Sequence, residues 1–280
     1  MTDIPIHKAT QQSDFGIFAK EVSYLLPNRA IDYVHRDDYY VFGIVECGTC
    51  RVSIDFKDYD LSAGNGICVQ PNQVHHVIEA GNAKALLLFM DGAFIDTPTK
   101  QTIAEYALSP VPFYINDRQC AELTQLFSMI LRRIDEWKTD KSKTVLLNLS
   151  CATAGIITDA IRELTIQKSK NRRHIEITLA FKELLSEEKQ INRHISYYAE
   201  ALHLSPVYLN EVVKNITGIS ISKYIQNELM LRAKRLLVYT SLNVREISIQ
   251  LGIEDYAYFT RLFTKTVGVN PTLYRKKYLE

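Results

Sequence analysis

The sequence predicts an α+β protein of two domains, a β-barrel with two accompanying helices followed by an all-α domain that contains two helix-turn-helix units. The chain has 280 residues, about twice the length of a common domain. Hydrophobicity has a period of two between residues 38 and 90, and a period of three to four beyond about residue 117. The segment 167–173 is polar and basic without one apolar residue, so we expect domains over 1–168 and 169–280.

The barrel is expected over residues 20–112. Residues 51–57 alternate polar and apolar without exception, which predicts a strand with one solvated face. A more buried run over 40–45 precedes it, and Cys47-Gly48-Thr49 is the predicted turn between the two. Further strands are expected over 66–70, 74–79 and 84–90, separated by Gly and Pro-Asn signals. Turns at this spacing favour a small barrel or sandwich over a parallel sheet.

Two amphipathic helices are expected within residues 117–166, split near 138–143. Their apolar residues fall three and four apart, as on one face of an α-helix. Such helices either cover the barrel or pair with a second copy of the chain. Of these two roles we expect the second, which predicts a homodimer.

Composition and charge limit the class of protein. Residues 171–280 hold 16 Lys and Arg against 11 Asp and Glu, a net charge of +5, whereas residues 1–170 have a net charge of −4. Only the second domain is therefore expected to meet a polyanion. No run of 18 apolar residues or cationic leader is found, and five scattered cysteines form no disulfide framework. We expect a cytoplasmic protein without membrane contact.

A helix-turn-helix pattern occurs twice in the second domain. Residues 198–202, 203–205 and 206–214 form the first unit, and 244–251, 252–254 and 255–266 form the second. Ser205-Pro206 and Asn243 are predicted helix starts, and a longer helix over 219–239 joins the units. Two such units are expected to reach successive major grooves of one duplex, about 34 Å apart.

Fixed spacings carry a resemblance to a known family. Residues 252–263, followed by Gly268, Pro271, Tyr274 and Arg275, resemble the signature of AraC/XylS-family transcription regulators, and residues 204–209 and 218–224 match the family's first unit. Residues 61–66 with Pro71 and His75, and His35 before the first strand, resemble the family's cupin-like sensing barrel. The resemblance implies a sequence-specific regulator that binds double-stranded DNA, responds to a small-molecule effector, and contacts RNA polymerase if it is an activator.

Helical geometry divides the side chains of the two recognition helices. Leu209, Val212 and Val213 are expected in the core, as are Phe259, Leu262 and Phe263, and Tyr258 is assigned to the core too. Glu211 departs from the basic or neutral residue that the resemblance leads us to expect. Asn pairs bidentately with adenine, Glu accepts from cytosine, and Val contacts a thymine methyl. The predicted base readers are Val207, Asn210, Glu211, Tyr256, Ala257 and Thr260. The predicted phosphate contacts are Lys214, Arg261, Lys265, Arg275, Lys276 and Lys277.

Chemistry in the first domain has less support. An effector pocket is expected to be lined by Phe42, Ile44, Val52, Ile54 and His75. The metal pattern of cupin enzymes needs two histidines one residue apart on an early strand. The candidate ligands in this sequence are His75, His76 and Glu79, with His35 farther off. The strand over 39–45 has no histidine, so we expect no metal, no cofactor and no enzyme activity. The single CxxC at Cys47 and Cys50 lies at a strand turn rather than a helix start, which disfavours a redox role.

Two alternatives remain open from the sequence. In one, the first domain has no small ligand and serves only to dimerise or to bind a protein partner. In the other, the chain is a cupin metalloenzyme with a helical tail. The alternation over 51–57 fits a packed barrel as well as a hollow one, so it does not decide between the first alternative and an effector-binding barrel.

Overall fold

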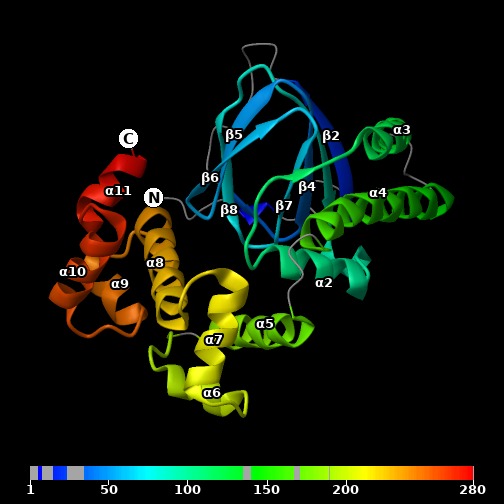
Figure 1. The fold of residues 1–280 in the computed structure, drawn as a ribbon. Helices are drawn as coiled ribbons and strands as arrows, with labels where there is room; N and C mark the ends of the chain where they lie inside the picture. Colours follow the sequence, from blue (N-terminus) through cyan, green and yellow to red (C-terminus); the bar gives the residue numbers. More distant parts are fainter. Residues whose placement is uncertain are drawn as a thin grey trace. The chain divides into compact units, whose positions relative to one another are not determined.

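The computed structural model describes residues 6–7, 15–23, 35–134, 140–166, 171–188 and 190–279 (Figure 1). The chain divides into two compact units, Pro5–Ser169 and Lys170–Glu280. The first unit is rich in β-structure and the second is helical, which confirms the predicted α+β class. The boundary expected between residues 168 and 169 lies outside the described residues.

The strands of the first unit form two five-stranded sheets with the orders β1-β3-β8-β5-β6 and β10-β7-β4-β9-β2. All described pairs are antiparallel except β1 with β3. Most consecutive strands lie in different sheets, and β5 and β6 pair directly. Two mainly antiparallel sheets agree with the small barrel or sandwich that the spacing of turns predicted. The bounds are β1 Ile6–His7, β2 Ile17–Ser23, β3 His35–Asp37, β4 Tyr40–Cys47, β5 Thr49–Ile54, β6 Lys57–Ser62, β7 Asn65–Val69, β8 Val74–Glu79, β9 Lys84–Met90 and β10 Phe113–Tyr114.

The expected strand over 51–57 is in fact a hairpin. β5 ends at Ile54, which pairs with Lys57, and the two residues between them have φ angles of 49° at Asp55 and 63° at Phe56. Two successive left-handed residues match the right-handed twist of the flanking strands. The Asp55 carboxylate accepts hydrogen bonds from the Gln73 amide at 3.0 Å and from the Val74 backbone N–H at 3.1 Å. Alternation concealed this turn because the apolar Phe56 occupies it.

The predicted turn between the first two long strands is confirmed at Gly48. Its φ is 75°, and a Cβ atom there would lie 2.4 Å from the backbone oxygen of Asn82. Only glycine fits both the conformation and the close approach.

Two hydrophobic clusters lie on opposite faces of the sheet that contains β4. The inner cluster lies between the two sheets and includes Val41, Val45 and Phe89. The outer cluster includes Phe42 and Leu88 and is covered by three helices. These are α2 Thr97–Tyr106, α3 Asp117–Ile134 and α4 Asp140–Ile166, preceded by the short 3₁₀ helix η1 Gly92–Phe94. The two expected helices are therefore present, and α2 lies within the segment assigned to the barrel.

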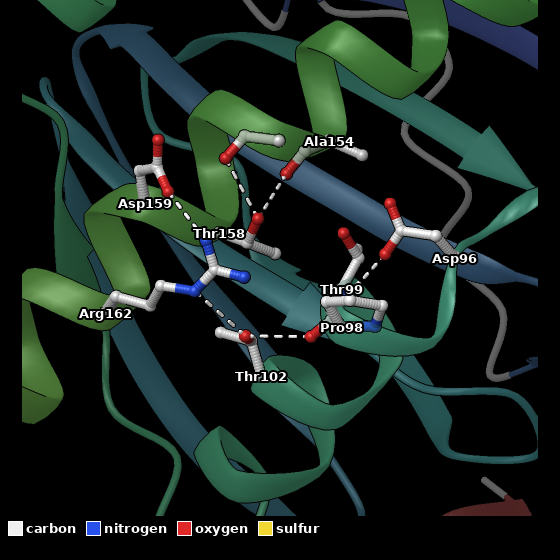
Figure 2. A network of polar contacts seen from close by, with 9 residues as sticks. Asp96, Pro98, Thr99, Thr102, Ala154, Thr158, Asp159 and Arg162 are labelled. Atoms are coloured by element: carbon white, nitrogen blue, oxygen red, sulfur yellow. Dashed lines mark hydrogen bonds and ion pairs between the residues drawn. The ribbon is translucent and has the colours of Figure 1, made fainter.

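A polar network fastens α2 to α4 (Figure 2). The Arg162 guanidinium on α4 donates to the Thr102 hydroxyl on α2 at 3.2 Å and pairs with Asp159 at 2.9 Å. The Thr102 hydroxyl in turn donates to the backbone oxygen of Pro98 at 3.0 Å. Asp96 caps α2 by accepting the Thr99 N–H, and this hydrogen bond lowers the pKa of the Asp96 carboxyl.

The segment Lys143–Leu164 of α4 is long and apolar enough to cross a membrane by length and composition alone. In the structure it is a core helix of the first unit. Leu146, Ile157 and Ile161 are at most 1% exposed within the outer cluster. The apolar character of this segment is therefore explained by packing against the barrel.

The second unit consists of helices in its described residues. Their bounds are α5 Arg172–Glu187, α6 Ile195–Ala201, α7 Pro206–Thr217, α8 Ile221–Tyr239, α9 Val244–Gln250, α10 Tyr256–Val267 and α11 Pro271–Leu279. The long helix α8 contacts α7, and it also contacts α9, α10 and α11. It therefore joins two smaller helical groups, α6–α7 and α9–α10.

Candidate nucleic-acid interface

The two helical groups share one backbone plan. After α6, His203 has a φ of 55°, and the Leu204 N–H donates to the Ala199 oxygen at 2.8 Å. After α9, Gly252 has a φ of 76°, and the Ile253 N–H donates to the Ser248 oxygen at 2.9 Å. In both groups a single left-handed residue ends the first helix and turns the chain into the second. The two predicted helix-turn-helix units are therefore both formed.

The second helix of each unit is fixed at both ends. Ser205 caps α7 by accepting the Tyr208 N–H, and Asp255 caps α10 by accepting the N–H groups of Ala257 and Tyr258. Gly218 and Gly268 end the two helices with φ angles of 80° and 91°. α7 and α10 thus have the same length and the same cap types, as expected of a repeated unit.

The α7 helix has one buried and one exposed face. Leu209, Val212 and Val213 are 0% exposed, as predicted from helical spacing. Val207 is 71% exposed, and Glu211 is also exposed. Both side chains are therefore available to a ligand outside the unit.

Asn210 differs from its expected role. Its side chain is half-buried, and its Oδ1 atom accepts the Ile221 N–H at the start of α8 at 3.1 Å. Bidentate pairing with adenine needs this oxygen as well as the amide nitrogen. In this conformation the oxygen holds the start of α8 against α7, so the bidentate contact stays a prediction that requires this hydrogen bond to open.

The α10 helix shows the same division with one correction. Phe259 and Phe263 are 0% exposed as predicted, and Leu262 is half-buried. Tyr258 was assigned to the core, but it is 39% exposed. The Arg193 guanidinium lies over its ring at 5.6 Å from the centroid, so Tyr258 packs at the edge of the unit against a cation.

The expected base readers on α10 differ in exposure. Tyr256 is 53% exposed, whereas Ala257 and Thr260 are half-buried. The Thr260 hydroxyl donates to the Tyr256 backbone oxygen at 2.9 Å, which leaves its lone pairs as acceptors.

Exposed cations border both recognition helices. Lys214 and Lys265 occupy the last turns of α7 and α10. Arg261 is 70% exposed in its side chain and lies 3.8 Å from Asp255. Lys276 is exposed on α11, whereas the side chain of Lys277 lies outside the described residues. These positions suit contacts that are salt-dependent and independent of base sequence.

Arg275 does not belong to this set. Its Nε donates to the Leu237 backbone oxygen at 2.7 Å, and its Nη2 donates to the Leu242 oxygen. The side chain is half-buried and ties α11 to the end of α8 and the segment before α9. The phosphate contact of Arg275 stays a prediction, but in this conformation two of its five N–H donors bond to backbone carbonyls within the helical unit.

An arginine that the sequence analysis missed has a similar role beside the first helix-turn-helix unit. Arg232 on α8 donates to the backbone oxygens of Glu188 at 2.6 Å and Leu185 at 2.7 Å. It thereby fixes the end of α5 and the start of the loop that leads to α6. No local pattern marks this residue, because its partners lie more than 40 positions away.

The loop between α5 and α6 also contacts the second helix-turn-helix unit. Gln190 donates to the Ile249 oxygen at 3.4 Å, and a Cβ atom on Gly252 would lie 3.4 Å from the Gln190 Cβ. Together with the contact of Arg193 with Tyr258, these contacts join the loop between α5 and α6 to the turn and to α10 of the second helix-turn-helix unit.

The side chains expected to line an effector pocket lie in two different layers of the first unit. Val52 and Ile54 belong to the inner layer between the sheets, and His75 pairs with Ile54. Phe42 and Ile44 point the other way, into the cluster under the helices. A shift of one residue moves every side chain to the opposite face, and β4 is buried on both faces, so alternation could not set its register. A hollow of about 320 Å³ lies elsewhere, at the ends of β5, β6 and β8.

Known families match both units in the same order. A family model described as an AraC-like ligand binding domain matches residues 23–148, and one described as a helix-turn-helix domain matches residues 198–277. The chain belongs to the AraC-type transcription regulators. Their combination of a ligand-binding domain with a DNA-binding domain accounts for both units of this AraC-type chain.

Relatives of this AraC-type regulator are named as regulators of transcription. It is 24% identical to the HTH-type transcriptional activator RhaR of Mannheimia succiniciproducens over 254 residues, which cover 88% of each chain. It is 32% identical to the HTH-type transcriptional regulator YfiF of Bacillus subtilis over 103 residues, which cover 37% of this chain and 31% of YfiF. Among solved structures, the C-terminal domain of the response regulator yesN from Fusobacterium nucleatum is 33% identical, with a TM-score of 0.32, over 34% of this chain and 93% of that domain.

Proposed function

We propose that this AraC-type regulator recognises a specific DNA site with α7 and α10 in successive major grooves. The observation that carries the proposal is the repeated backbone plan, which buries one face of each helix and exposes the other. A helix-turn-helix unit presents its second helix to the groove in this way. The net charge of +5 in residues 171–280 supplies the non-specific attraction to phosphate.

Within this proposal, readers and clamps occupy different positions. Base contacts come from exposed or half-buried side chains at the starts and outer faces of the helices, namely Val207, Glu211, Tyr256, Ala257 and Thr260. Phosphate contacts come from Lys214, Arg261, Lys265, Lys276 and Lys277. Glu211 suits a cytosine N4 donor and would repel a phosphate.

Selection of random duplex DNA on the full chain at two salt concentrations tests the proposal. We expect one motif with two half-sites about ten base pairs apart. Binding that depends on salt but enriches no motif would reduce the helical unit to a general polyanion binder, and no binding would refute the proposal.

Two substitutions then test the division into readers and clamps. Val207→Ala is expected to relax sequence preference at one base position, at a cost of roughly 1–3 kcal/mol for the selected site. Lys265→Ala is expected to weaken binding to all sequences and to reduce the slope of log K against log salt by about one. Titrations of selected and scrambled duplexes by fluorescence anisotropy measure both effects. Identical behaviour of the two variants would contradict the division.

We further propose that the first unit senses a small molecule, as the name of its matching family implies. The inner layer favours a second candidate function, in which this unit only dimerises or binds a protein. Phe18 and Phe89 stack there at 4.2 Å, and Tyr39 packs edge-on against both rings, so large side chains fill part of the space between the sheets. A thermal-shift screen with small molecules separates the two, provided each hit is then tested for its effect on DNA affinity.

The remaining partners follow from the same proposal. A homodimer would use the outer faces of α3 and α4, where Met129 and Val145 are 37% and 38% exposed. RhaR is named a transcriptional activator, and if this chain is an activator too it would contact RNA polymerase. We place the protein in the cytoplasm and assign it no enzyme activity, because its relatives are named as regulators of transcription. Sedimentation velocity of the full chain tests the dimer.

A further inference from the structure

Two histidines and one aspartate converge inside the first unit. His35 and Asp37 lie on β3, and His75 lies on β8 directly opposite His35 in the strand register. Residues two apart on a strand project from one face, as do residues paired across strands, so all three side chains share a face. One potential ligand atom from each lies within 4.8 Å of the other two. Of the four residues compared with the cupin metal pattern in the sequence, His35 and His75 belong to this set, whereas Asp37 takes the place of His76 and Glu79.

The three groups are sequestered from solvent. Asp37 is 1% exposed and His35 is 8% exposed, and the His75 side chain is 14% exposed. His75 also pairs with Ile54, which places the cluster on the face that lines the inner layer. A carboxylate buried to this degree requires a compensating positive charge nearby.

The distances between donors suit a small cation. His75 Nε2 lies 3.3 Å from Asp37 Oδ2, and His35 Nε2 lies 4.0 Å from Asp37 Oδ1. Ligands bonded at about 2.0–2.1 Å in a tetrahedral arrangement lie roughly 3.3 Å from one another. The first distance matches this value, and the second requires a closure of less than about 1 Å, within the reach of side-chain rotation.

The hydrogen bonding of His75 sets its orientation. Its Nδ1 lies 3.1 Å from the Gln73 backbone oxygen, which can only accept, so Nδ1 carries a proton. Nε2 is the atom that faces Asp37. Histidine ligands of metal ions typically donate one ring N–H to a backbone carbonyl and bind the ion through the other ring nitrogen.

A hydrogen-bonded cluster is the alternative to a metal ion. With one imidazolium ion and one neutral ring that carries its proton on Nε2, both rings could direct an N–H group at the Asp37 carboxylate. The His35 Nε2 atom, however, lies 4.0 Å from Asp37 Oδ1, which is too long for a hydrogen bond, and the two ring centroids are 4.3 Å apart. One divalent cation can be bound by all three groups together.

We propose that His35, Asp37 and His75 bind one divalent transition-metal ion of the zinc class. Two imidazole nitrogens and one carboxylate are ligands that Zn²⁺ accepts with a fourth position open to water or to another donor. The ion would join β3 to β8 next to the inner layer. This proposal stands independently of the DNA-binding function.

Metal binding by the purified full chain tests the proposal. After removal of metal with a chelator, the protein is titrated with Zn²⁺ against a chromophoric competitor, and with Co²⁺ by visible absorption. We expect one equivalent of Zn²⁺ and a Co²⁺ spectrum of tetrahedral or five-coordinate type. His75→Ala and Asp37→Asn are expected to weaken Zn²⁺ binding by at least about 100-fold, since each removes a direct ligand.

His76→Ala is the matched control. His76 neighbours His75 but pairs with Ser53, so it projects from the opposite face of the sheet. This variant and Cys47→Ser/Cys50→Ser are both expected to keep one equivalent of Zn²⁺. Loss of binding in either control, or its retention in both His75→Ala and Asp37→Asn, would overturn the assignment.

Thermal melting guards against variants that fail to fold. Zn²⁺ is expected to raise the Tm of the wild-type chain and of His76→Ala, but not the Tm of the conservative variant Asp37→Asn. If the wild-type chain takes up no Zn²⁺ at micromolar concentration, the cluster is an imidazolium–carboxylate pair and the proposal is wrong.

Discussion

The two helix-turn-helix units have the same backbone and different side chains. The left-handed turn residue is His203 in the first unit and Gly252 in the second. Their core positions repeat at an interval of 50 residues, with Leu209 matching Phe259 and Val213 matching Phe263. Burial and caps thus define the unit, and several residue types meet each requirement.

The outer faces of the two recognition helices differ in charge. The α7 helix carries one acid and one base, Glu211 and Lys214, whereas α10 carries Arg261 and Lys265 and no acid. Because phosphate contacts supply much of the affinity for DNA, the second unit is expected to contribute more salt-dependent binding than the first. The comparison therefore separates a shared scaffold from two distinct contact surfaces.

The largest expected effect follows removal of the arginine that stabilises each helix-turn-helix unit. Arg232→Ala and Arg275→Ala each leave two backbone carbonyls without a charged donor. We expect either change to lower the free energy of unfolding by about 2–3 kcal/mol, in line with hydrogen bonds to charged groups. Urea denaturation followed by circular dichroism measures the loss.

Lys265→Ala is the control for this pair, since an exposed lysine should change stability by no more than about 0.5 kcal/mol. Arg275→Ala should leave the salt slope of DNA binding unchanged. A reduced slope with unchanged stability would restore Arg275 to the phosphate contacts.

A smaller effect distinguishes the matched positions Asn210 and Thr260. Asn210→Ala removes the hydrogen bond to the Ile221 N–H at the start of α8, so we expect a stability loss of roughly 1 kcal/mol. The Thr260 hydroxyl only bonds back to its own helix, so Thr260→Ala should cost less than about 0.5 kcal/mol. Thermal denaturation of the two variants compares them. Equal losses would show that Asn210 has no special role in the scaffold.

The last comparison concerns the two turns, and it includes the variant with the smallest expected net change, His203→Gly. Gly252→Ala places a side chain at a φ of 76° and should cost about 1 kcal/mol. His203→Gly relieves a φ of 55° but adds freedom to the unfolded chain, so the net change should be within about 0.5 kcal/mol. Chemical denaturation of the single variants checks this asymmetry. A large gain from His203→Gly would mean that the first turn is under more strain than the second.

Local signals explain what the sequence could predict. Ser205-Pro206, Asp255, Gly218 and the spacing of Leu209 to Val213 are properties of a few adjacent residues, and they placed both units correctly. The roles of Arg275 and Asn210 depend instead on carbonyl and amide groups in other helices, which no periodicity reveals. Both residue types also suit DNA contacts, which is the interpretation that the sequence favoured.

The barrel shows the same limit in another form. Phe42 and Ile44 were placed on the wrong side because β4 has buried residues on both faces and therefore no alternation. His35 and His75 were both candidate ligands, but Asp37 and the pairing of the two histidines were missed, because β3 has only three residues and its pairing with β8 joins positions 40 apart. Sequence reasoning was reliable where the structure is local and one face is solvated.

The double-sided burial of β4 and β9 has a mechanical consequence. Val41 and Phe89 face the space between the sheets, while Phe42 and Leu88, their neighbours in sequence, press on the layer under α3 and α4. Close-packed interiors have low compressibility and pass strain onward. A displacement of side chains on the inner face of this sheet therefore shifts side chains on its helix-covered face. A ligand inside the barrel would act in this way on α3 and α4, the helices that a second copy of the chain would contact.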